Sequence, residues 1–239
     1  MNLDIVKVPF TNNPSMIRLE GPAYNNNPNE KYLKLKKKEI ELNKEKLYGE
    51  SELSINLGLL SKIKDFLEVS QDNGLRDLTE QLEEDFVLMH KGKMEIVSVC
   101  FPSGWIPINK LGKDLMAIHS SVADSEQLLK SSKKLSEYMC KQSIKRWVWT
   151  ITTYPELSNF PGYVKPEVNR FEDLFFRLET QTSVPLGQDT SLFFIKVEVL
   201  PLREVWNIKM KESINSMTEN ILNYKDLQQI KQLLNTIKI

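Results

Sequence analysis

The chain has 239 residues, of which 41% are hydrophobic and 27% are charged, and its 32 basic residues balance 32 acidic ones. This composition is ordinary for a globular protein with one large domain or two small ones. Because there is no net positive charge to hold a phosphate backbone, the sequence argues against a nucleic-acid-binding protein.

The N-terminal segment and the cysteines indicate a cytoplasmic protein. The chain starts with MNLDIVKVPF, which lacks the long apolar stretch of a signal peptide. No apolar run approaches the roughly 20 residues that cross a bilayer. Cys100 and Cys140 lie too far apart for a CxxC motif. We therefore expect a soluble protein without membrane contact, whose reduced cysteines pack as small hydrophobic residues.

Residues 1–90 are predicted to be mostly helical. The first helix starts with Asn27 as its N-cap and Pro28 at the first helical position. A second helix is predicted over 57–67. A third is predicted over 75–90, where apolar residues recur at helical spacing, namely Leu75, Leu78, Leu82 and Phe86.

Residues 91–203 are predicted to form a sheet core with two helices, over 108–119 and 124–140. Four segments have strand-like composition or alternation: 94–101, 146–153, 174–181 and 191–200. The last two read as an antiparallel hairpin. Residues 204–239 are helical again, with an apolar stripe formed by Leu227, Ile230, Leu234 and Ile237. The pattern predicts an α+β fold with a mainly antiparallel sheet and helices at its ends and over one face.

His119 is the first candidate for chemistry, and one of two histidines. It lies four residues after Leu115 and borders a predicted apolar helix face. Such a histidine is more often a core residue than a ligand, and a general base is a third reading. No HExxH motif or Cys/His quartet accompanies it for zinc. A single imidazole on an apolar wall is also what a haem protein with one axial histidine needs.

A second candidate group lies on the predicted strand over 174–181. Strand alternation places Arg177, Glu179 and Gln181 on one face. Charged and polar residues that alternate in this way usually lie on a solvent-exposed face of a sheet. A buried Arg–Glu pair is costly without a function, and a carboxylate in an apolar pocket can bind a cationic amine.

The neighbouring strand also has two faces. Trp147, Trp149 and Ile151 share one face, and Arg146, Val148 and Thr150 share the other. The large tryptophans are usual core residues, but they can equally form the wall of a site for a flat cofactor. The chain contains no GxGxxG, Walker-type or GxSxG motif, so it is a poor candidate for a self-contained reductase or an esterase.

Several stretches together resemble one known family: CFPSGWIPINKLGKDLMAIHSSV, RWVWTI, FFRLETQTSVPL and SLFFIKVEVLPL. They are similar to the haem-dependent oxidative N-demethylases, of the type of the haem-binding subunit of dimethylamine monooxygenase. The matching residues are Pro102, Gly104, Trp105, Lys110, Gly112, Ile118, His119, Arg146, Arg177, Glu179, Gln181, Thr182, Pro201 and Leu202. The chain departs from the family pattern at Thr180, where a second arginine is expected, and over 120–123, where prolines are usual.

The resemblance implies a single PAS-like domain over 1–239 that binds haem b, with His119 as the proximal iron ligand and metal-binding residue. It implies O2-dependent oxidation of an N-methyl group of a small amine such as dimethylamine, with release of formaldehyde. Electrons would come from separate flavin or Fe–S reductase subunits.

The resemblance also suggests roles for individual residues. Glu179 would bind the substrate ammonium or accept its proton, Arg177 would orient Glu179 or stabilise charge on bound oxygen, and Gln181 would support them. Arg146 or Lys110 would pair with haem propionates. The walls of the macrocycle site would be formed by Trp105 and Trp147.

The sequence is also compatible with two other functions. The first is a non-catalytic haem or small-molecule sensor, because PAS-like folds host sensing widely. The second is a structural subunit that has lost haem.

Overall fold

A seven-stranded antiparallel sheet organises the chain in a computed structural model that describes residues 3–12 and 15–237. Its strand order is β1-β5-β6-β7-β3-β4-β2. The strands are β1 (Ile17–Arg18), β2 (Tyr48–Glu50), β3 (Asp85–His90), β4 (Lys93–Ser98), β5 (Ile144–Thr152), β6 (Phe175–Pro185) and β7 (Thr190–Pro201). The predicted α+β class is confirmed, and its PAS-like part stays a prediction.

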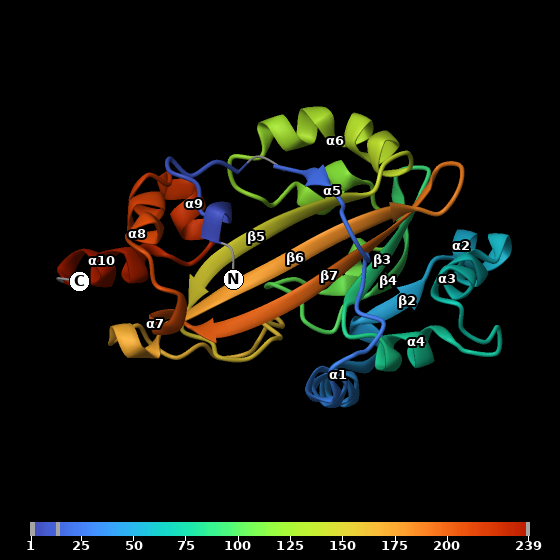
Figure 1. The fold of residues 1–239 in the computed structure, drawn as a ribbon, viewed down its shortest axis with the longest axis horizontal. Coiled ribbons are helices and arrows are strands. Elements are labelled where there is room, and N and C mark those ends of the chain that lie inside the picture. The colour runs from blue at the N-terminus through green and yellow to red at the C-terminus, as the bar shows by residue number, and fades with distance from the viewer. Residues whose placement is uncertain (1–2, 13–14, 238–239) are drawn as a thin grey trace.

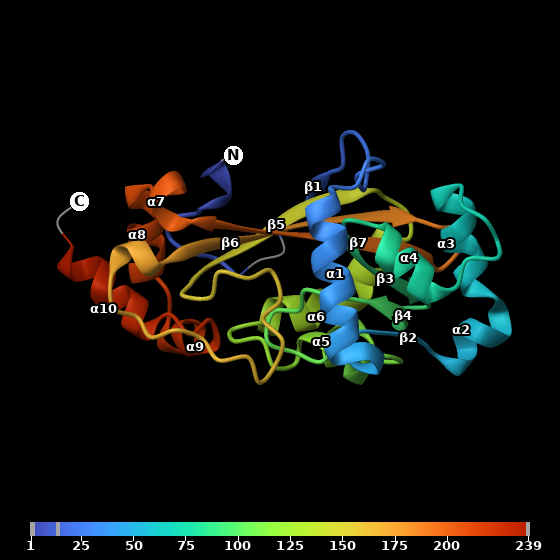
Figure 2. The ribbon, with the colours of Figure 1, turned by 90° about the horizontal axis from the view of Figure 1, so that it is seen from below.

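The helices gather in groups around this sheet (Figures 1 and 2). α5 and α6 lie together on one side of the long strands, and α7 to α10 gather at one end. The N-terminal helices are α1 (Glu30–Asn43), α2 (Glu52–Leu57), α3 (Leu59–Leu67) and α4 (Leu75–Gln81). The others are α5 (Leu115–His119), α6 (Glu126–Met139), α7 (Leu202–Val205), α8 (Ile208–Asn215), α9 (Glu219–Tyr224) and α10 (Gln228–Thr236).

The predicted hairpin over 174–200 is present as β6 and β7, and β5 pairs along the other edge of β6. The register sets Arg146 opposite Gln181, and Thr150 opposite Arg177. Directly paired residues in a sheet point to the same face. Polar side chains of two strands therefore converge on one side of the sheet.

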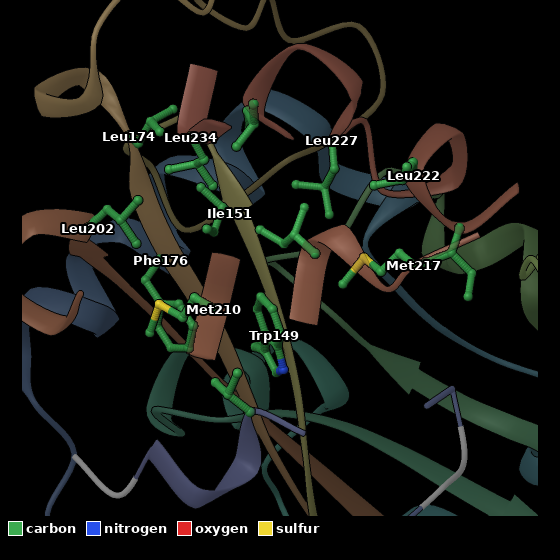
Figure 3. Close-up of a cluster of buried hydrophobic side chains, with 14 of the residues drawn as sticks. Trp149, Ile151, Leu174, Phe176, Leu202, Met210, Met217, Leu222, Leu227 and Leu234 are labelled. Carbon is green, nitrogen blue, oxygen red and sulfur yellow. The ribbon is translucent and has the colours of Figure 1, made fainter. Parts of the chain in front are cut away.

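The C-terminal helices cover the other face of β5 and β6 with an apolar core (Figure 3). Trp149 stacks on Phe176 with ring centroids 5.9 Å apart. The predicted stripe residues Leu227, Ile230 and Leu234 are all buried in this core. A second core under α3 and α4 packs against the β3 and β7 region of the same sheet.

Two predicted helices differ from the structure at their ends. α1 starts after Asn29, not Asn27, because the Asn29 side chain accepts from Lys31 N at 2.9 Å. The helix predicted over 75–90 ends at Gln81, because residues 85–90 pair with β4 and β7 on both sides. β1, β2 and β3 thus join the sheet although they fall in the range 1–90 that the sequence predicts as mostly helical.

In place of the helix predicted over 108–119, the structure has two short helical segments. A 3-10 turn spans Pro107–Lys110, and α5 begins only at Leu115. Gly112 separates them with a φ of +75°, a conformation that favours glycine. Its backbone N–H donates to Met94 O at 2.7 Å, so the chain docks on β4 instead of continuing a helix. In the described residues, no helix is long and apolar enough to cross a membrane.

A fully buried ion pair joins α1 to the sheet. Lys36 Nζ lies 3.2 Å from Asp85 Oδ1, and both side chains are completely inaccessible to solvent. The Asp85 carboxylate also accepts the backbone N–H groups of Cys100 at 2.9 Å and Phe101 at 2.8 Å. This carboxylate thereby fixes the chain that leaves β4.

We predict that Asp85→Ala lowers the free energy of unfolding by about 3–5 kcal/mol, because it leaves the Lys36 ammonium buried without its counter-ion. The exposed Asp72 provides the matched control, since Asp72→Ala should stay within about 0.5 kcal/mol of the wild type. Urea unfolding followed by circular dichroism measures both. Equal losses in the two variants would contradict a structural role for the pair.

Candidate functional site

A cavity of about 680 Å³ lies between the polar face of the sheet and the α5–α6 side of the molecule. This volume falls in the range of sites for small ligands and cofactors. Its apolar wall includes Val87, Met89, Leu115, Met139 and Phe193. Its polar lining brings together residues that are far apart in the chain: Ser103, Lys110, His119, Arg146, Arg177, Glu179, Gln181 and Lys225.

His119 is the last residue of α5, and it is half-buried in this lining. Its Nδ1 lies 2.9 Å from Leu115 O. A carbonyl oxygen only accepts hydrogen bonds, so Nδ1 carries the proton and Nε2 keeps its lone pair. Burial lowers the pKa of His119, the hydrogen bond to Leu115 opposes this, and the charges of Arg146 and Lys110 lower it further. The result is a neutral imidazole with one nitrogen able to bind a metal.

Arg177 holds the loops at one end of the cavity. Its guanidinium donates to Phe101 O at 3.0 Å, to Leu157 O, and to Ser103 Oγ at 3.1 Å. The side chain is almost fully buried, and all three of its nitrogens are used in these contacts. Arg177 therefore acts on the site by positioning its neighbours.

Glu179 is the carboxylate that this arrangement positions. Its Oε1 accepts from Ser103 Oγ and lies 3.9 Å from Arg177, while its Oε2 accepts from Gln181 Nε2 at 2.9 Å. Ser103 is a contact that the sequence reasoning missed. It falls inside the matched PxGW turn, but no spacing rule links it to a strand more than 70 residues later. Glu179 is thus held in one orientation inside the cavity.

Arg146 lies opposite Gln181 on the cavity face of β5. Its Nε atom is buried and has no hydrogen-bond partner among the described residues. Burial lowers the pKa of Arg146, and the charge of Glu179 opposes that shift. A buried guanidinium nitrogen without a hydrogen-bond partner is unusual, because leaving a charged donor unsatisfied is costly.

Lys225, just after α9, is a second cation that the sequence reasoning did not single out. Its Nζ donates to Trp149 O at 3.0 Å and lies 5.6 Å from the Phe10 ring centroid. Its pKa is lowered to about 8, mainly by burial; the charge of Glu179 opposes the shift and that of Arg146 adds to it. This lysine lies in the stretch NYKDLQQIKQLL, whose helical pattern does not point to a cavity.

The two tryptophans predicted to form walls lie in different places. Trp105 lines the cavity and packs against the apolar cluster of Val87 and Met94. Trp147 does not line the cavity, in contrast to the prediction. Strand alternation puts it on the face opposite Arg146, where Lys145 Nζ lies 5.3 Å from its ring centroid.

Thr180, the departure from the family pattern, is also away from the cavity. It lines a separate surface groove together with Lys145, Thr182 and Lys196. The absence of a second arginine at this position therefore leaves the cavity lining unchanged.

Comparison with protein families gives one match. A family model described as "Haem-dependent oxidative N-demethylase, alpha subunit-like" matches residues 33–235, which include every polar residue of the cavity named above. A search of curated proteins found no match.

We predict that burial of Lys225 makes the protein more stable as pH rises from about 8 to about 10.5. In this range the unfolded lysine binds more protons than the folded one, so the free energy of unfolding increases with pH. Lys225→Met should lose this increase, whereas Lys231→Met, a change of a lysine on α10 outside the cavity, should retain it. Urea unfolding across this pH range measures the difference, and parallel curves for the two variants would contradict it.

Proposed function

The chain belongs to the haem-dependent oxidative N-demethylase, alpha subunit-like family, and from this premise we propose that it is a haem enzyme that demethylates a small N-methylated amine such as dimethylamine. Its whole length would form a single PAS-like haem-binding domain. The observation that carries the proposal is the presence, in one cavity, of a neutral histidine and of an arginine whose buried Nε has no hydrogen-bond partner among the described residues.

The residues of the cavity fit haem b. His119 would bind the iron through Nε2, since Nδ1 is engaged by Leu115 O and fixes the ring. Arg146 and Lys110 would bind the propionates. Lys110 Nζ donates to Ile118 O at 2.8 Å, next to His119. The Nε of Arg146 has no hydrogen-bond partner among the described residues and is free to donate to a propionate. Trp105 and the apolar wall would contact the macrocycle.

When bound, haem supplies the iron at which O2 is activated for oxidation of the N-methyl carbon. The overall reaction places one oxygen atom in a C–H bond of the methyl group and releases the other as water, consuming two electrons and two protons. The N–CH2OH group then breaks its C–N bond and yields formaldehyde and the demethylated amine.

The protein's own groups would orient the amine. The Glu179 carboxylate would bind the ammonium or accept its proton, because it is negatively charged and held by Ser103 and Gln181. Arg177 would keep Ser103 and Glu179 in register without contacting the amine, since its nitrogens are already used.

The two electrons would come from a separate reductase with flavin or Fe–S centres. The sequence contains no GxGxxG or Walker-type motif to bind a nucleotide cofactor of its own. This assignment of the electron donor is part of the proposal, as is a cytoplasmic location.

We expect His119→Ala to abolish the Soret band of the haem-reconstituted protein or shift it, because the change removes the axial ligand. His90 is the matched control. It is buried outside the cavity, where its Nδ1 lies 2.8 Å from Thr190 Oγ1, so His90→Ala should keep the wild-type spectrum. An absorption spectrum of each variant measures this. A wild-type Soret band in His119→Ala would overturn the ligand assignment.

We expect Glu179→Gln to retain haem but to reduce formaldehyde release from dimethylamine about 100-fold or more, as loss of a positioned acid–base group does. The exposed Glu172, outside the cavity, is the control for the same substitution. The assay supplies reductant and O2 and measures formaldehyde against a haem-free sample. Turnover of Glu179→Gln equal to that of Glu172→Gln would show that this carboxylate is dispensable.

A further inference from the structure

The charges that line the cavity do not balance. Three cations, Lys110, Arg146 and Lys225, have no carboxylate oxygen within 4.0 Å in the part of the chain that the structure describes. Two further cations line the cavity, namely Arg177, which is 3.9 Å from Glu179, and Lys165. The other lining carboxylates lie in more exposed positions: Glu156, Glu167 and Asp226, the last of which pairs with Lys165. A ligand of this cavity therefore meets an excess of positive charge.

The proposed cofactor accounts for only part of this excess. Two propionates would neutralise Lys110, whose Nζ donates to Ile118 O beside His119, and Arg146, which interacts with both His119 and Glu179. Lys225 is not among the charges that shift His119. Instead it interacts with Glu179 and Arg146. One ammonium would thus remain beside the carboxylate that is proposed to bind the amine.

Lys225 is held in place. Its backbone N–H donates to Ile221 O at 2.9 Å, and its Nζ donates to Trp149 O at 3.0 Å, which leaves other ammonium protons for a ligand. The adjacent Asp226 forms an ion pair with Lys165 at 3.0 Å, so the turn between α9 and α10 is tied to the loop at the cavity mouth. A burial-lowered pKa of about 8 still leaves Lys225 mainly protonated at neutral pH.

We propose that the substrate is a zwitterion, an N-methylated amino acid, whose ammonium end binds Glu179 and whose carboxylate end binds Lys225. This inference rests on the proposed N-demethylase function and names its substrate class. Glu179 and Lys225 line the same cavity and are close enough to interact, yet they are more than 4.0 Å apart. A small zwitterion placed between them satisfies both charges, whereas dimethylammonium satisfies only Glu179.

The simplest member of this class is N-methylglycine. Its demethylation balances as for any N-methylamine: N-methylglycine, O2, two electrons and two protons give glycine, formaldehyde and water. The carboxylate takes no part in the bond changes. It contributes binding energy that is independent of the reacting methyl group.

Calorimetric titration of the haem-reconstituted protein tests the proposal with N-methylglycine, its amide, which keeps the ammonium but lacks the carboxylate, and dimethylamine. N-methylglycine should bind at least about tenfold more tightly than the other two, as expected for one charge-assisted hydrogen bond. Lys225→Gln should remove this preference and Lys225→Arg should keep it. Lys231→Gln on α10 is the matched control. Unfolding curves check that each variant folds.

The formaldehyde assay on the same samples separates the two proposals. Equal binding of the acid and its amide, or an unchanged preference in folded Lys225→Gln, overturns the zwitterion proposal. Formaldehyde from dimethylamine but none from N-methylglycine overturns it as well, while the demethylase function stands. Lys225-dependent binding of N-methylglycine without formaldehyde from any of the amines supports the binding site and overturns the demethylase function.

Discussion

The buried ion pair of Lys36 and Asp85 is the constraint on which the site depends. It lies at the point where α1 crosses the sheet, and its carboxylate also accepts the N–H groups of Cys100 and Phe101. Desolvating two charges is expensive, and each becomes a liability if the other is lost. The interaction is worth this cost because it fixes the start of the loop that carries Ser103 and Trp105 into the cavity.

From this pair, a chain of hydrogen bonds reaches the cavity. Phe101 O accepts from Arg177, Arg177 also donates to Ser103, and Ser103 donates to Glu179. The first two steps start from the buried Arg177 guanidinium, and Ser103 links it to the carboxylate at the end of the chain. Networks of this kind rigidify a site and set the direction in which its charged group points. The orientation of Glu179 thus originates in the contact of α1 with β3, well outside the cavity.

The sequence predicts local relations in this site better than distant ones. Alternation correctly groups Arg177, Glu179 and Gln181 on one strand face, and the pattern of elements correctly gives an α+β fold. It does not say whether that face points to solvent or to a cavity, because the answer depends on which strands and helices lie against it. Strand alternation in β5 likewise places Trp147 and Arg146 on opposite faces of the sheet.

Other features depend on long-range pairing that no local window contains. β3 reads as a helix because Leu82 and Phe86 keep helical spacing, yet β4 and β7 on its two sides make it a strand. Lys225 reaches the cavity from a helical segment about 80 residues beyond Arg146 in the sequence. Residues of this kind are predictable only once the packing of the C-terminal helices on the sheet is known.

The hydrogen bond from Lys225 to Trp149 O also affects the exposed edge of the sheet at β5. β1 pairs with only Ile144 and Lys145 of the nine residues of β5, so most of that strand lies at the edge of the sheet. Unsatisfied backbone groups on such an edge can recruit a strand from another molecule. Lys225 satisfies one such carbonyl, and the C-terminal helices pack next to it. The residue that we assign to substrate binding therefore also covers a backbone acceptor on the edge of the sheet.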